Sequence, residues 1–287
     1  MLDDILVPTD GSECAATAVG YATDLANTYG ATVHTLCVAD ARFLENAPHG
    51  ERIRAERAEL AERTCAAFEA AGIQAKQTVR TDVPHRAILE YAADEGVDLV
   101  VMGTHGRTGV ERYLLGSVTE KVVRLSDVPV LTVKSMAEDA VTYPYGDVLV
   151  PTDGSDGAAA ATDLAVDLAS TYGARLHALS VVDTMAMGLD VRSDAIVERL
   201  EGEAQRAVGA VERRAADTAI AGTETAVEHG KPHGAIRSYV ETHGVDLVVM
   251  GTHGRSGLER YLLGSVAEKT VRTSPAPVVT VRPAEGE

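Results

Sequence analysis

The residues best suited to chemistry in this chain are three glycines and a serine at fixed spacing. Gly103 and Gly106 enclose Thr-His, and Gly116-Ser117 follows after nine further residues. Because glycine has no Cβ, backbone N–H groups there can approach an anion closely. A helix that opens at Gly116-Ser117 adds free N–H groups and a dipole that favour a phosphate. The same pattern recurs at Gly251, Gly254, Gly264 and Ser265.

This spacing differs from both common phosphate-binding motifs. It lacks the Lys of a GxxxxGK[ST] loop, and it is not a GxGxxG turn. A glycine-rich connection without any ligand is the alternative for a single loop. The near-identity of the two copies favours binding.

An aspartate is the second candidate in each copy. PTDGS occurs at 8–12 and again at 151–155, each time after an apolar run. The carboxylates of Asp10 and Asp153 can accept hydrogen bonds from ribose hydroxyls or help to hold a cation. The alternative is that Asp, Gly and Ser form only the turn into the next helix, which the serine would cap.

Charged and titratable side chains lie beside the glycine-rich loops. Arg107 and Arg255 can supply positive charge there. His105 and His253 are the candidates for positioning a water, but no carboxylate accompanies them at fixed spacing, so we interpret them as packing or capping residues. A structural role is also expected for His34, His85, His177 and His233.

The chain is a tandem duplication. Residues 95–133 and 243–281 are identical at 30 of 39 positions. The offset between copies grows from 143 to 148 along the chain, and the five additional residues are most simply placed near 184–192. The apolar pattern lapses at 135–146, and each copy is long enough for its own core. The sequence therefore predicts two domains, 1–138 and 145–287.

Short apolar runs alternate with helical patterns in each copy. In the first copy we expect strands at 5–8, 32–38, 73–79, 97–102 and 128–133, and helices at 13–29, 51–72, after Pro84, and at 117–126. This alternation indicates βαβ units with a parallel sheet. We predict an α/β protein of two doubly wound five-stranded domains, whose ligands bind at the carboxyl ends of the strands.

The composition and net charge of the chain limit the classes of binding partner that we expect. The net charge is −17, which argues against binding to nucleic acid or to anionic membranes. The chain has 26 Lys and Arg residues, of which only five are lysines. An acidic chain poor in lysine is what we expect of a protein from a high-salt cytoplasm. An ordinary acidic cytoplasmic protein is the alternative.

The three cysteines, at 14, 37 and 65, all lie in the first copy and have no CxxC spacing. We therefore expect reduced, mostly buried thiols rather than disulfides or a metal site. The amino terminus does not resemble a signal peptide, and no apolar stretch reaches about 18 residues, the length of a membrane span. These features predict a cytoplasmic protein.

With the spacing G-x2-G-x9-G-[S/T] in both copies, the chain resembles the universal stress protein family, and specifically its ATP-binding branch. PTDGS, the DLVVMGTHG block and the final PVxTV run also fit. The resemblance covers nearly the whole chain. It implies domains of the adenine nucleotide α-hydrolase-like group with strand order 3-2-1-4-5.

The resemblance also implies two competent sites for ATP, or for AMP or ADP, with Mg²⁺ as an accompanying ion. Asp10 resembles the carboxylate near the ribose and adenine, and Val38 the residue whose backbone meets the adenine edge. In the first copy the nucleotide-binding residues would be Pro8, Thr9, Asp10, Val38, Met102, Gly103, Gly106, Arg107, Gly116, Ser117 and Val118. In the second they would be Pro151, Thr152, Asp153, Val181, Met250, Gly251, Gly254, Arg255, Gly264, Ser265 and Val266.

Family members commonly dimerise through the last strand. The apolar runs 128–133 and 276–281 can therefore pair within the chain as a pseudo-dimer, and a homodimer of whole chains is compatible with this. Three functions remain in view. The first is an ATP-binding regulatory protein of the stress response with an unknown protein partner. The second is a slow ATP hydrolase or autophosphorylating enzyme, and the third an interaction module with vestigial loops.

Overall fold

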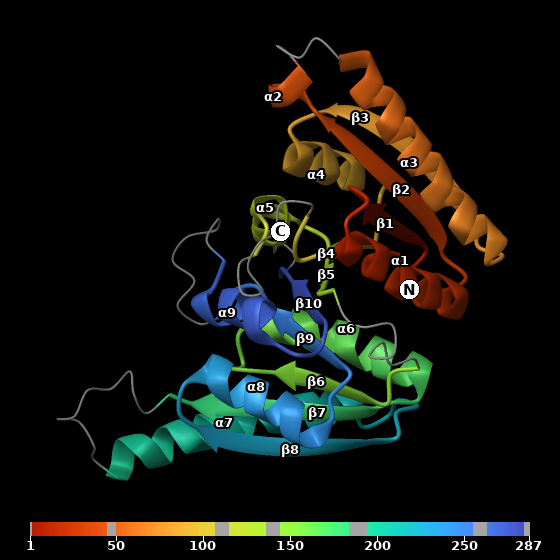
Figure 1. The fold of residues 1–287 in the computed structure, drawn as a ribbon. Helices are drawn as coiled ribbons and strands as arrows, with labels where there is room; N and C mark the ends of the chain where they lie inside the picture. Colours follow the sequence, from red (N-terminus) through yellow and green to blue (C-terminus); the bar gives the residue numbers. More distant parts are fainter. Residues whose placement is uncertain are drawn as a thin grey trace. The chain divides into compact units, whose positions relative to one another are not determined.

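The protein forms two compact units, residues 1–141 and 142–287. The computed structural model describes residues 2–44, 50–106, 115–135, 144–183, 194–254 and 263–283. Each unit is an α/β layer structure in which helices flank parallel strands (Figure 1). Among the described helices, none is long and apolar enough to cross a membrane.

The first unit has a parallel sheet in the order β3-β2-β1-β4-β5, as predicted. Helices α1 and α3 cover one face, and α4 and α5 cover the other (Figure 1). Its elements are β1 (Asp4–Pro8), α1 (Glu13–Tyr29), β2 (Thr32–Asp40), α2 (Ala41–Leu44), α3 (Gly50–Ala70), β3 (Ala75–Asp82), α4 (Pro84–Asp94), β4 (Leu99–Gly103), α5 (Ser117–Leu125) and β5 (Val130–Val133).

Two details of the first unit differ from the sequence prediction. The short helix α2 was not expected, and β3 begins at Ala75 and continues to Asp82 rather than ending near residue 79. β3 pairs along its whole length with β2, and this pairing fixes its bounds. Its side chains are mostly exposed or half-buried, because it is an outer strand. The central β1 and β4 are buried and continuously apolar, as expected for a sheet covered on both faces.

The turn from β1 into α1 is built by local polar contacts. The Ser12 hydroxyl accepts a hydrogen bond from the Ala15 N–H at 3.3 Å and caps the helix. The helix ends at Gly30, whose φ of 71° is the left-handed conformation that glycine adopts without strain. Along the helix, Ala18, Ala22 and Ala26 are buried, so α1 can lie close to the sheet. The carboxyl end of β1 is therefore held rigidly beside the start of α1.

The second unit repeats this plan in the order β8-β7-β6-β9-β10, again parallel. Ser155 caps its first helix as Ser12 does in the first unit. Its elements are β6 (Asp147–Pro151), α6 (Asp156–Tyr172), β7 (Arg175–Val182), α7 (Asp194–Ala215), β8 (Gly222–His229), α8 (Pro232–His243), β9 (Leu247–Gly251), α9 (Ser265–Thr273) and β10 (Val278–Val281).

The register of α7 corrects the predicted position of the additional residues in the second copy. The buried residues of α3 are Ala61, Cys65 and Phe68, and those of α7 recur 143 positions later as Ala204, Val208 and Val211. In the sheets, Ala75 pairs with Val33, and Thr223 pairs with Leu176, an offset of 148 on the outer strand. The five additional residues therefore lie between Val211 and Thr223, not near 184–192. The predicted position was wrong because the buried residues of a helix determine its alignment with the other copy, and the irregular composition of 184–192 gives no information on burial.

The histidines in the second strand of each unit are structural, as predicted. His34 is fully buried; its Nδ1 lies 3.0 Å from the Tyr91 hydroxyl and its Nε2 2.7 Å from the Asp4 carboxylate. His177 makes the equivalent contacts with Tyr239 and Asp147. Both networks lie at the strand ends opposite the PTDGS turns. The three cysteines are free thiols and buried.

Candidate functional site

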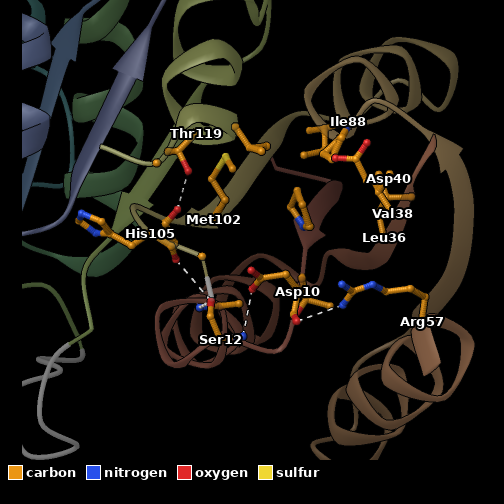
Figure 2. Close-up of a pocket in the computed structure, with 18 of the residues that line it drawn as sticks. Asp10, Ser12, Leu36, Val38, Asp40, Arg57, Ile88, Met102, His105 and Thr119 are labelled. Atoms are coloured by element: carbon orange, nitrogen blue, oxygen red, sulfur yellow. Dashed lines mark hydrogen bonds between the residues drawn. The ribbon is translucent and has the colours of Figure 1, made fainter. Parts of the chain in front are cut away.

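A pocket of about 530 Å³ opens at the carboxyl ends of β1, β2 and β4 in the first unit. Its floor is the turn after β1, one side is the loop from β4 to α5, and the opposite side comes from α2 and α3 (Figure 2). Ten predicted residues line it together: Pro8, Thr9, Asp10, Val38, Met102, Gly103, Gly106, Gly116, Ser117 and Val118. Arg107 and, in the second unit, Arg255 lie outside the described residues.

Asp10 stands where the strand becomes the turn. Its Oδ1 accepts a hydrogen bond from the Ser12 N–H at 3.0 Å, and the Thr9 hydroxyl accepts one from the Gly11 N–H at 3.3 Å. The Asp10 carboxylate lies against the glycine-rich loop, since a Cβ on Gly106 would be only 2.6 Å from its Oδ2. The turn after β1 and the loop after β4 therefore form one surface.

The structure explains the glycines of the motif differently from the sequence prediction, which assigned them to ligand access. None of the motif glycines has a positive φ. A Cβ on Gly103 would lie 2.6 Å from the Cβ of Cys14, and one on Gly116 would lie 3.0 Å from the Thr104 carbonyl oxygen. The missing side chains thus let the start of α1 and the loop itself pack closely. Access for a ligand is not required to explain these three glycines.

The amino end of α5 has no such internal partner. Its N-cap is Gly116, which provides no side-chain cap, whereas α1 is capped by Ser12. The Gly116 N–H bonds to the Thr104 carbonyl at 2.8 Å, and the Thr119 hydroxyl donates to the Gly103 carbonyl at 2.8 Å. The residues of the first turn, from Ser117 to Thr119, line the pocket, and the N–H groups of a first helical turn have no acceptor within the helix. This open helix end is suited to an anion.

The side of the pocket away from α5 is mostly apolar. Leu36 and Val38 lie at the end of β2, and Ile88 lies beside them, whereas Met102 lies next to Thr119 of α5 (Figure 2). Asp40 also lines it, but its carboxylate is bound by Arg42 at 2.5 Å, and the hydrogen bonds from Arg42 lower the pKa of Asp40. This apolar side can hold a flat, uncharged group such as a nucleobase.

His105 lines the pocket at the glycine-rich loop. Its ring points away from Asp10 and the apolar wall (Figure 2), and its Nδ1 lies 3.0 Å from the Thr104 hydroxyl. Burial lowers the pKa of His105, and Lys134 lowers it further. The Nε2 atoms of His105 and His253 are buried and have no hydrogen-bond partner in the described part of the chain. The geometry supports the packing interpretation over a catalytic base.

The second unit repeats the contacts around the turn and loop. Asp153 Oδ1 accepts from the Ser155 N–H at 3.0 Å, and a Cβ on Gly254 would be 2.6 Å from Asp153 Oδ2. Helix α9 begins after Gly264 without a side-chain cap, as α5 does after Gly116. The other predicted residues take matching places: Pro151, Thr152, Val181, Met250, Gly251, Ser265 and Val266.

The sequence analysis missed the wall formed by α2 and α3. Phe43, Ile53, Glu56 and Arg57 from these helices line the pocket. In α3 they share one face, with Ile53 and Arg57 one helical turn apart, and this spacing was the available signal. Among the described residues, no group of three or more His, Cys, Asp or Glu side chains is placed to hold a metal ion.

The likeness to known proteins extends over both units. The sequence profile of the universal stress protein family matches residues 1–134 and again 144–282. A universal stress protein of Mycobacterium bovis is 31% identical over 239 residues, which cover 81% of this chain and 77% of that protein. A universal stress protein of Methanocaldococcus jannaschii is 36% identical over 141 residues, 48% of this chain and 82% of that protein. The crystal structure of a universal stress protein from Archaeoglobus fulgidus has a TM-score of 0.72 at 26% identity and covers 98% of both chains.

Proposed function

Because the chain belongs to the universal stress protein family, we propose that it is a regulatory protein of the stress response, acting in the cytoplasm, that binds one adenine nucleotide in each unit. The observation that carries the proposal is the pocket of the first unit. An uncapped helix end, a carboxylate and an apolar wall meet in about 530 Å³, a volume usual for small-molecule sites.

Each part of the pocket suits a different part of the ligand. The N–H groups of Ser117 and Val118 would hold phosphate oxygens at the positive end of the α5 dipole. The Asp10 carboxylate, which has about four acceptor positions, would accept a ribose hydroxyl in addition to its bond from Ser12. The adenine would lie on the apolar wall with its edge at the Val38 backbone. Mg²⁺ would accompany the phosphates, with the Ser117 hydroxyl and Asp10 as nearby oxygen ligands.

Titration with Mg-ATP tests the proposal. We expect two binding events per chain in isothermal titration calorimetry, and an adenine nucleotide in the mass spectrum of ligand released from the purified protein. No binding at millimolar nucleotide would overturn it. Parallel titrations with ADP, AMP and cyclic AMP would identify the cellular ligand, since all four share the adenosine half.

Slow ATP hydrolysis or autophosphorylation is the second candidate. It needs a group that positions water or accepts its proton near the terminal phosphate. His105 lines the pocket, but its ring points away from Asp10, which disfavours it for that role (Figure 2). If the two loop histidines are catalytic, the double variant His105→Ala, His253→Ala will lose turnover. Unchanged release of phosphate would remove them from consideration. The third candidate, vestigial loops, predicts no nucleotide binding at all.

Regulation would act through surfaces shared with a partner. We propose that the last strands of the two units pair with each other within the chain, over 128–133 and 276–281, as an intramolecular pseudo-dimer. β5 and β10 are short and apolar, and each is the last strand in its own unit's order, where an unpaired strand promotes association. Hydrogen exchange tests this: paired strands will exchange slowly in both. Native mass spectrometry will report whether chains of 30.1 kDa associate further.

A further inference from the structure

Arg57 enters the pocket from α3 and contacts the turn that carries Asp10. Its Nη1 donates a hydrogen bond to the Asp10 carbonyl oxygen at 3.2 Å, between residues 47 positions apart (Figure 2). This is one of five donors on the guanidinium. The side chain is half-buried. The remaining donors are therefore presented at the edge of the pocket, close to the carboxylate proposed to hold the ribose.

Arg57 brings positive charge to the described part of the pocket. Among the described residues that line the pocket, it is the only lysine or arginine. The acidic lining residues Asp40 and Glu56 are engaged by Arg42 and Arg52. No carboxylate oxygen in the described part of the chain lies within 4 Å of the Arg57 guanidinium. On a chain of net charge −17, a half-buried arginine without an acidic partner is unusual.

The second unit has a different residue at the position that corresponds to Arg57. Ala61 and Ala204 are matching buried residues of α3 and α7, and they lie 143 positions apart. The same offset places Leu200 in the second unit where Arg57 stands in the first. It also pairs Glu56 with Arg199, whose side chain is 75% exposed and forms an ion pair with Glu203 at 3.5 Å. The two walls therefore differ in charge, although the turns and glycine-rich loops that face them are nearly identical.

We propose that Arg57 is a specificity-determining residue that makes the site of the first unit select the charged nucleotide over the uncharged nucleoside more strongly than the site of the second unit does. The inference rests on the proposed nucleotide function. In the first unit the anionic part of the ligand would be attracted both by the open end of α5 and by the guanidinium. In the second unit it would be attracted by the end of α9, without a guanidinium at the position of Leu200. Charge-assisted bonds from a guanidinium to phosphate are strong enough to create this difference.

The test exchanges the two residues in the full-length chain. Ser265→Pro weakens the second site by about 10- to 100-fold, and Arg57→Leu is then made in that background. We expect about tenfold weaker binding of ATP, as for loss of one charge-assisted contact, and less than twofold change for adenosine. In the reciprocal background, with Ser117→Pro, the variant Leu200→Arg should strengthen ATP binding at the second site by several-fold. Arg57→Lys should retain part of the affinity.

The outcomes separate a charge role from a structural one. If Arg57→Leu weakens ATP and adenosine equally, the arginine only supports the Asp10 turn, and the proposal is wrong. If neither ligand is affected, it is also wrong. Absence of ATP binding to the unsubstituted chain would instead overturn the proposed function itself, and this is seen before any variant is made. The melting temperature of each variant checks that the unit remains folded.

Discussion

The two units present nearly the same loop but different helical walls. In both, the aspartate after the first strand touches the second glycine of the motif, and the helix after the motif is uncapped. The opposite wall changes from Arg57 on α3 to Leu200 on α7. The motif glycines are constrained by close contacts in the described part of each loop, whereas a helix needs only its sheet-facing residues to keep its place. Divergence is therefore concentrated where packing allows it.

The largest expected effect is a loss of ATP affinity when one N–H group is removed from the amino end of α5. Ser117→Pro removes one N–H from the first position of α5, where proline fits a helix and Gly116, with φ −60° and ψ 139°, already has the conformation found before proline. We expect a loss of about 10- to 100-fold in ATP affinity at the first site, because a charge-assisted hydrogen bond is lost. Calorimetry should then show one strong event instead of two.

Ser117→Ala is the matched control, since it removes the hydroxyl and keeps the N–H. It should weaken ATP binding by only a few-fold. Ser265→Pro and Ser265→Ala should divide in the same way at the second site. If the alanine and proline variants lose equal affinity, the phosphate position at the helix end is wrong, even if nucleotide binds elsewhere in the pocket.

The next effect concerns stability and separates packing from binding. Gly103→Ala would bring a Cβ within 2.6 Å of Cys14 Cβ and 2.8 Å of the Cys14 carbonyl carbon. Gly251→Ala would meet the carbonyl carbon of Gly157 at 2.6 Å. Each should destabilise its own unit by about 1–3 kcal/mol, as overpacked sites do. Thermal unfolding without nucleotide measures it.

The control for this prediction is Cys14→Gly, which gives the first unit the residue of the second. Because backbone atoms remain in the way, Cys14→Gly should not rescue Gly103→Ala. Full rescue would show that only the thiol side chain forbids the substitution. A Gly103→Ala variant of unchanged stability would leave ligand access as the reason for the glycine.

These contacts explain why the sequence predicted which loop residues line the pocket but not why glycine is needed at those positions. The period of apolar residues placed the strands and helices, and the spacing of Asp10, Gly106 and Gly116 indicated residues that do lie in one pocket. Spacing does not reveal what fills the space of a missing Cβ, so the contact of Gly103 with Cys14 was not foreseen. Arg57 was missed for a related reason: its contact with Asp10 joins elements 47 residues apart and depends on how α3 lies on the sheet.

A smaller and more uniform effect should follow from charge. Residues 1–142 hold 22 acidic and 13 basic residues, and residues 143–287 hold 21 and 13, so the two halves carry −9 and −8. If this acidity is an adaptation to a salty cytoplasm, molar KCl should raise the melting temperature of both units together, by several degrees for about 1 kcal/mol each. Flat or falling stability would count against the adaptation. A rise in the melting temperature of one unit alone would contradict the expectation that both units respond equally to salt.

The smallest effect is a change in the pH dependence of the first unit. Burial, with a smaller contribution from Lys134, lowers the pKa of His105, so the folded state binds a proton less readily than the unfolded state. As the pH falls through about 6.5, the ordinary value for histidine, the unfolded state gains protons first and stability is lost. His105→Gln should flatten the profile of stability against pH at about pH 6.5. Above pH 7 this residue should contribute no pH dependence to the stability in either protein. Because the His105 ring points away from Asp10 (Figure 2), ATP affinity should not follow the same titration. If ATP affinity instead changes with protonation of His105, the charge of the ring acts on the ligand, and the assignment of this histidine to packing is wrong.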